Sequence, residues 1–110
     1  MKLPKRRSAY VPGEKLHGYL LSRTHPIGRW KSKLFRDLGF DESNVDLLEI
    51  QLIDIANSET VKESIISEHG TKYVVDGSLE TPSGSFLRVR TVWIIDEGED
   101  RPRFVTAYPV

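Results

Sequence analysis

The first half of the chain carries apolar residues at helical spacing. A first helix is predicted over residues 13–21, with an apolar stripe at i, i+3 and i+4 made of Leu16, Tyr19 and Leu20. A second helix follows with its own apolar face, made of Ile27, Trp30, Leu34, Phe35 and Leu38. Pro26 suits the first position of this helix, with Thr24 or His25 as its cap, and Gly39 suits the position after its last turn.

A third helix is predicted after Ser43, because Ser43-x-x-Asp46 resembles a capping box. Its stripe comprises Val45, Leu48, Leu52, Ile55 and Ala56. Pro4 and Pro12 predict an extended arm over residues 1–12. Residues 57–69 fit either a short helix or an irregular crossing.

The second half changes to strand periodicity. Three strands are predicted over residues 71–80, 85–96 and 103–108, separated by a turn at 81–84 and a polar loop at 97–102. Short connections favour an antiparallel meander of three strands, with a fourth left open. The chain is therefore expected to be one α+β domain over residues 1–110, with an arm (1–12), helices (13–57) and a β-meander (70–110).

Composition and charge narrow the class of protein. Hydrophobic residues make up 38% and charged residues 29%, as in a globular domain, and the chain has no cysteine. No run of about 18 apolar residues predicts a membrane span, and a cytoplasmic location is expected. The net charge of zero hides ten Lys/Arg against one acid in residues 1–36 and eleven acids against two lysines in residues 37–80. This asymmetry fits either attraction to phosphate backbones or two solvated faces of opposite sign.

Two residues near the start of the second helix depart from the local pattern. Lys31 falls near the centre of the apolar face, so its ammonium must snorkel, form an ion pair or line a site. His25 stands at the helix start, where the helix dipole favours a neutral imidazole that acts as a base near pH 7. A helix cap is the alternative role for His25.

The strands add further candidates. Arg88 and Arg90 project from the same side of one strand, about 7 Å apart, which suits consecutive phosphates or acids on neighbouring strands. Thr106 and Tyr108 share a face of the last strand, where hydroxyls can hold a phosphate, although both residue types are also common in strands. The histidines lack zinc-ligand spacing, and the sequence lacks the glycine-rich motifs of nucleotide-binding sites. We therefore expect no metal and no cofactor.

Several segments together resemble a known family. They are Thr-His-Pro-Ile-Gly-Arg-Trp-Lys (24–31), Gly-Thr-Lys-Tyr-Val-Val-Asp-Gly (70–77), Val-Arg-Thr-Val-Trp-Ile-Ile-Asp (89–96) and Pro-Arg-Phe-Val-Thr-Ala-Tyr-Pro (102–109). The chain is similar to a small bacterial domain family of unknown function, found alone or at the ends of large secreted toxins. That family resembles, more distantly, the barnase–EndoU–colicin E5/D–RelE group of metal-independent ribonucleases.

The resemblance implies an endoribonuclease of bacterial toxin type that cleaves RNA by attack of the ribose 2′-hydroxyl. By this comparison the catalytic residues are His25, Lys31, Thr106 and Tyr108, and the substrate-binding residues are Lys72, Arg88, Arg90 and Trp93. The expected partners are RNA and a small antitoxin or immunity protein. The alternative is a non-catalytic module that binds protein or RNA in a toxin–antitoxin or toxin–immunity system. A second histidine for a two-histidine ribonuclease is missing, and the zero net charge favours this alternative.

Overall fold

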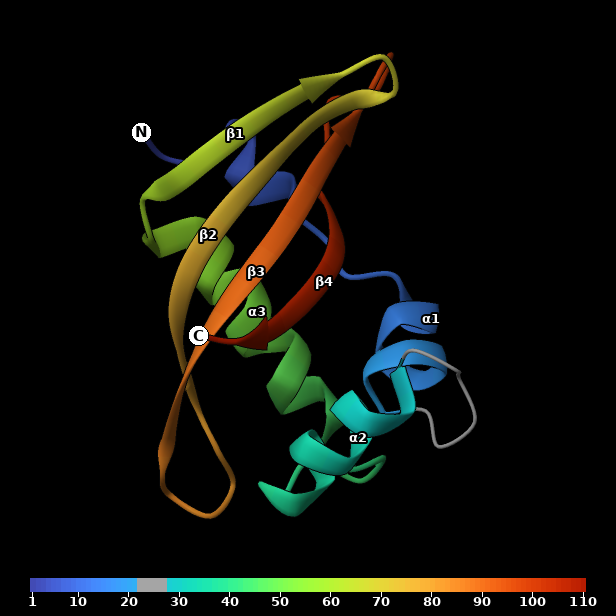
Figure 1. The fold of residues 1–110 in the computed structure, drawn as a ribbon, viewed down its shortest axis with the longest axis vertical. Helices are drawn as coiled ribbons and strands as arrows, with labels where there is room; N and C mark the ends of the chain where they lie inside the picture. Colours follow the sequence, from blue (N-terminus) through green and yellow to red (C-terminus); the bar gives the residue numbers. More distant parts are fainter. Residues whose placement is uncertain (22–27) are drawn as a thin grey trace.

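The computed structural model describes residues 1–21 and 28–110, without the side chains of residues 19 and 28–31. Helical segments come first: η1 (Arg6–Ser8), α1 (Gly13–Lys15), η2 (Leu16–Leu20), α2 (Gly28–Asp37) and α3 (Val45–Ser58). Four strands follow: β1 (Val61–Ser67), β2 (Gly70–Glu80), β3 (Phe86–Asp96) and β4 (Arg103–Pro109). The expected α+β order is confirmed (Figure 1).

The strands form one antiparallel meander in the order β1-β2-β3-β4. The three predicted strands are confirmed within a residue or two of their expected ends. Residues 61–67, however, form neither a helix nor an irregular crossing; they are the fourth strand. A shift in the pairing between Val61 and Glu63 breaks the alternation of β1, which explains why periodicity did not reveal it.

The helices cover one side of the sheet, which we call the inner face, and leave the outer face uncovered (Figure 1). α3 crosses the inner face and packs on β2. Its buried residues are Leu48, Leu52, Ile55 and Ala56. The sheet meets them with buried residues of β2, β3 and β4, chiefly Val75, Leu79, Val89, Trp93, Phe104 and Ala107.

Alternation along the strands sets the two faces. β2 and β3 pair without a break from Gly70↔Asp96 to Glu80↔Phe86. Val75 is directly opposite Thr91, so both side chains lie on the inner face. The pairing of β3 with β4 shifts between Val92 and Trp93. This shift lets Phe104 and Ala107, three residues apart, both face the core.

Two helix predictions need correction. The first helix is a single α-helical turn that continues as π-helix through Leu20. The residue before α3 is Asn44, and it caps no helix N–H, so the predicted capping box does not form. Ser43 instead donates its hydroxyl and its backbone N–H to the Asp41 carboxylate. The predicted start of the second helix lies outside the described residues.

The N-terminal arm closes part of the sheet. Tyr10 forms a parallel bridge with Arg103 at the start of β4, with backbone bonds of 3.0 Å to Pro102 and Phe104. Arg101 stacks over the Tyr10 ring at 4.1 Å. No helix among the described residues is long and apolar enough to cross a membrane.

Candidate functional site

The outer face of the sheet gathers most of the predicted strand residues. Arg90 is opposite Tyr108, Val92 is opposite Thr106, and Lys72 is opposite Ile94. The predicted residues on this face are Lys72, Arg88, Arg90, Thr106 and Tyr108. Because the helices pack on the inner face, these side chains lie on the side that remains open to a ligand (Figure 1).

Arg90 is held at the middle of this face by Asp76. Its Nε and Nη2 donate to the two carboxylate oxygens of Asp76 at 2.9 and 3.0 Å, a bidentate pair between directly opposed residues. The hydrogen bond from Arg90 lowers the pKa of Asp76, and the bond to Asp76 raises the pKa of Arg90. Asp76 is therefore ionised at neutral pH and fixes the plane of the guanidinium.

Tyr108 reaches the same guanidinium from the other side. The Arg90 guanidinium donates to its hydroxyl oxygen, and this hydrogen bond also raises the Arg90 pKa. Thr106 lies two residues away on the same face of β4, and both side chains are half-buried. A guanidinium beside a tyrosine hydroxyl, with a threonine hydroxyl on the same strand face, is an arrangement that can hold a phosphate.

More cationic residues surround this centre. Lys72 and Arg88 are exposed. Lys62 lies close enough to Asp76 to lower the Asp76 pKa, although by less than Arg90 does. Arg103, by contrast, is paired with Asp96 at 3.1 Å. The same face also carries two exposed carboxylates, Glu63 opposite Val74 and Glu80 opposite Phe86.

The two helix candidates are not tested by the structure. His25 lies outside the described residues. Lys31 belongs to α2, but its side chain is not described. α2 packs against η2, and α3 is the helix that crosses the sheet. Among the side chains of α2 that the structure describes, those of residues 32–37, Ser32 and Phe35 are buried.

Trp93 must be removed from the expected substrate-binding set. Its side chain is fully buried on the inner face, where it packs edge-on against Phe104 at 5.4 Å between ring centroids. Its indole Nε1 donates to Thr91 Oγ1 at 2.9 Å. Trp93 is three residues from Arg90 along β3, so its side chain projects from the opposite face, and burial of the larger side chain explains why the core took that face.

Two residues of this face were missed by sequence reasoning. Asp76 was not considered, although the predicted antiparallel pairing of its strand with the next offered a carboxylate for Arg90. Phe86 is the second, and it is 72% exposed on the outer face. Phe86 is two residues from Arg88 and four from Arg90, so strand alternation predicts that its side chain shares their face.

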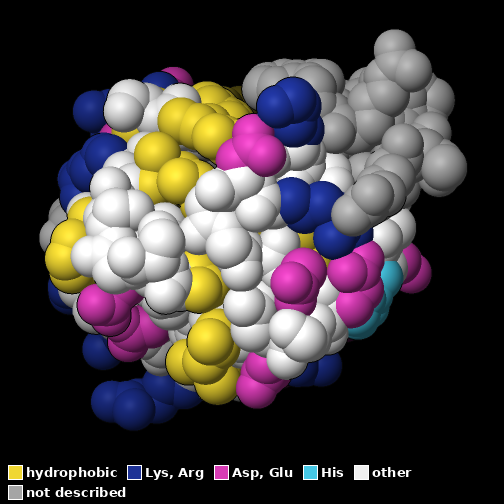
Figure 2. Space-filling model, turned by 90° about the horizontal axis from the view of Figure 1, so that it is seen from below, with side chains coloured by type: hydrophobic (Ala, Val, Ile, Leu, Met, Phe, Trp, Pro, Cys, Tyr) yellow, Lys and Arg dark blue, Asp and Glu magenta, His cyan; other side chains and the backbone are white. Residues whose placement is uncertain are grey.

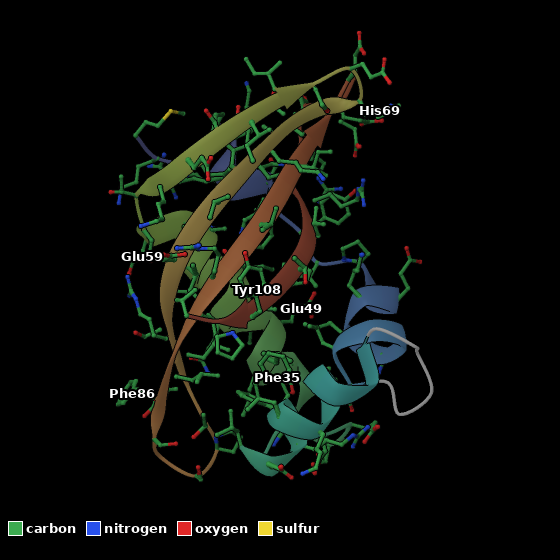
Figure 3. The ribbon with its side chains drawn as sticks, viewed as in Figure 1. Phe35, Glu49, Glu59, His69, Phe86 and Tyr108 are labelled. Carbon is green, nitrogen blue, oxygen red and sulfur yellow. The ribbon has the colours of Figure 1, made fainter. Side chains whose placement is uncertain are left out.

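The remaining histidines lie elsewhere. His69 is at the β1–β2 turn, at the far tip of the sheet from Tyr108 (Figure 3). His17 is exposed in η2. In the described part of the chain no group of three His, Asp or Glu side chains is placed to hold a metal ion. A hollow beside His69 is lined by Glu68, Asp96, Glu97 and Glu99 among others, a surface that disfavours phosphate.

The charge asymmetry of the sequence is partly neutralised in the fold. Arg36 of the basic third forms an ion pair with Glu42 and also donates to the Leu21 carbonyl oxygen at 2.7 Å. Lys33 pairs with Asp37 at 3.0 Å. Figure 2, seen from the end that carries the β2–β3 turn, shows acidic and basic side chains interspersed. Among the described residues, part of the basic third is therefore paired with nearby acids.

Comparison with known proteins places the chain in a family. Residues 2–110 match a domain of unknown function (DUF6883), so the chain belongs to that family. No match was found among curated proteins. The fold is also similar to a chain of a contact-dependent growth inhibition toxin–immunity protein complex from Klebsiella pneumoniae 342. The TM-score is 0.73 at 15% sequence identity, covering 96% of each chain.

Proposed function

We propose that this chain is a metal-independent endoribonuclease of bacterial toxin type, with its site on the outer face of the sheet. The observation that carries the proposal is the Arg90–Asp76 pair with Tyr108 beside it and Thr106 on the same strand face. The likeness of the whole fold to a chain of a toxin–immunity complex supports the toxin class. The sequence resemblance to the barnase–EndoU–colicin–RelE group supports the chemistry.

The proposed reaction is an internal transfer at phosphorus. The ribose 2′-oxygen attacks the adjacent phosphorus, its proton passes to His25, and the bond to the 5′-oxygen breaks. Arg90 and Lys31 stabilise negative charge on the phosphoryl oxygens. Tyr108 donates a proton to the leaving 5′-oxygen, and Thr106 orients the phosphate. The products are a 2′,3′-cyclic phosphate and a 5′-hydroxyl end.

The cell-based test is direct. The chain is expressed under tight control, and growth and total RNA are followed after induction. We expect growth arrest with discrete RNA fragments, and loss of both with Tyr108→Phe at equal protein level. Normal growth with intact RNA at high levels of folded protein would contradict the proposal.

A second candidate function, binding of an antitoxin or immunity protein, is favoured by the edge of β1. β1 pairs with β2 on one side, and its other edge is met by the N-terminal arm only at its start, through Lys2–Thr60 and Val61–Met1. Ile65 and Ile66 are 47% and 84% exposed. An open edge with apolar side chains suits addition of a strand from a partner protein.

The partner test uses the protein encoded beside this chain, co-expressed and co-purified with it. We expect a stable one-to-one complex that Ile66→Lys weakens and that Ile50→Lys, at an exposed position of α3, leaves intact. Equal binding by both variants would place the partner elsewhere.

A further inference from the structure

Phe86 is an aromatic residue that the core does not use. It is the first residue of β3, and its side chain is 72% exposed. Figure 3 shows its ring projecting away from the body of the protein. Single exposed apolar residues are common, so exposure alone assigns no role to Phe86.

Its neighbours on the same face give the second observation. Phe86, Arg88 and Arg90 alternate along β3, so all three project from the outer face at intervals of about 7 Å. Arg88 is exposed, and among the described residues its side chain makes no hydrogen bond or ion pair beyond its longer-range attraction to Asp76. An aromatic ring therefore stands beside an available guanidinium, in line with the Arg90–Tyr108 centre.

Aromatic and cationic side chains alternating on a sheet face match the alternation of bases and phosphates along an unpaired strand. A phenyl ring offers stacking to any exposed base, while arginine binds the phosphates on either side. In a duplex the bases already stack on each other and their faces are not accessible. The aromatic ring is therefore expected to favour binding of single-stranded over double-stranded RNA.

We infer that Phe86 is a base-stacking platform and that the outer face takes single-stranded RNA. One unpaired base stacks on Phe86, a phosphate of the same strand contacts Arg88, and the chain continues along β3 toward Arg90 and Tyr108. This inference rests on the proposed function for the location of the site, and it adds the class of substrate.

The experiment is a binding measurement that needs no cleavage. Fluorescence anisotropy is recorded with the full chain and a 2′-O-methyl RNA of 12 nucleotides, which lacks the attacking hydroxyl, and with a duplex of the same sequence. We expect the wild type to favour the single strand. Phe86→Ala is expected to weaken single-strand binding about tenfold and to leave duplex binding unchanged, whereas Phe86→Trp retains binding.

Ile50→Ala is the matched control, because Ile50 is 61% exposed on α3 and lies away from β3 and its arginine row. It is expected to bind like the wild type. Equal single-strand affinity for Phe86→Ala and the wild type, preference for the duplex, or no binding of either RNA would overturn the inference. Cleavage of the unmodified RNA of the same sequence distinguishes the two proposals. If this RNA binds through Phe86 but is never cut, only the ribonuclease is refuted; if it is cut without a Phe86 effect on binding, only the platform is refuted.

Discussion

Arg90 contacts Asp76 and Tyr108 at the same time, and this explains how a sheet residue is held ready for a ligand. The bidentate bond to Asp76 uses Nε and Nη2 and leaves other guanidinium N–H groups for an anion. An arginine on an open sheet face would otherwise lose side-chain freedom on binding. Asp76 is therefore best described as a positioning residue for Arg90.

The pair predicts a specific pH dependence of stability. The pKa of Asp76 is lowered in the folded state from its ordinary value of 3.8, mainly by the hydrogen bond from Arg90. A carboxylate with a lowered pKa stabilises the fold above its unfolded pKa, and that stability is lost as the pH falls through the folded value. Asp76→Asn is expected to have a lower free energy of unfolding than the wild type at pH 7, and this difference should shrink toward pH 3.

Urea unfolding of both proteins across this pH range measures the effect. Asp54→Asn, at an exposed carboxylate of α3, is the control and should follow the wild type. A difference for Asp76→Asn that stays constant with pH would contradict the role given to the Asp76–Arg90 pair.

Tyr108→Phe tests the proposed acid. The change removes one hydroxyl from a half-buried strand residue, so folding should be little affected, by about 1 kcal/mol. Cleavage should fall roughly 100-fold or more, because general acid catalysis contributes on that scale. Single-turnover rates with thermal melts as the folding control measure both quantities. An unchanged rate would remove Tyr108 from the mechanism.

His25→Ala tests the proposed base. If His25 is the base, cleavage should be abolished, while loss of a helix cap costs only about 1 kcal/mol of stability. His17→Ala, at an exposed histidine, is the matched control and should remain active. Equal activity of the two variants would leave the base unassigned.

Residue-level prediction from the sequence succeeded where alternation decides the outcome. The pattern of β3 placed Arg88 and Arg90 on one face and Trp93 on the other, and the structure has the same division. The assignment of Trp93 to substrate binding failed because the larger apolar side chain belongs with the core. Asp76 escaped notice because its role depends on cross-strand register, which one strand alone does not reveal.

At the scale of elements, β2, β3 and β4 were predictable because their apolar and polar residues alternate between clear turns. β1 was not, since its shifted pairing and adjacent Ile65 and Ile66 erase the period of two. The end of α2 was predicted by Gly39, whose φ of 102° favours glycine. The predicted cap of α3 failed because Asp41 binds Ser43 in a local turn.

The contact between α3 and β2 gives a prediction at this scale. A Cβ built at Gly77 would lie 2.8 Å from Ile55 Cγ1 and 2.9 Å from its Cγ2, near the base of a buried side chain. Gly77→Ala is therefore expected to push α3 from the sheet and lower the free energy of unfolding by about 1–3 kcal/mol. Denaturant unfolding measures the loss.

Gly18→Ala is the control for that experiment. A Cβ at Gly18 meets no heavy atom within 4 Å, so no comparable loss is expected. Equal stabilities of Gly77→Ala and the wild type would show that α3 does not pack closely enough on β2 to need glycine there.

At the scale of the whole molecule, the helices pack on the inner face of the sheet and the proposed site lies on the outer face. All packing against α3 uses the inner face, so the outer face carries polar and charged residues without cost to the core. The overall charge of zero is compatible with a phosphate-binding face, because basic residues elsewhere are paired with acids, as in Arg36–Glu42.

The central claim is that the outer face cleaves RNA by 2′-hydroxyl attack without a metal ion. The most direct measurement is analysis of the fragment ends produced by the purified chain from a single-stranded RNA in excess EDTA. We predict fragments with 2′,3′-cyclic phosphate and 5′-hydroxyl ends, formed by the wild type and nearly absent with Tyr108→Phe. Cleavage that disappears in EDTA and returns with added metal, fragments with other ends, or no cleavage by folded protein would contradict the account.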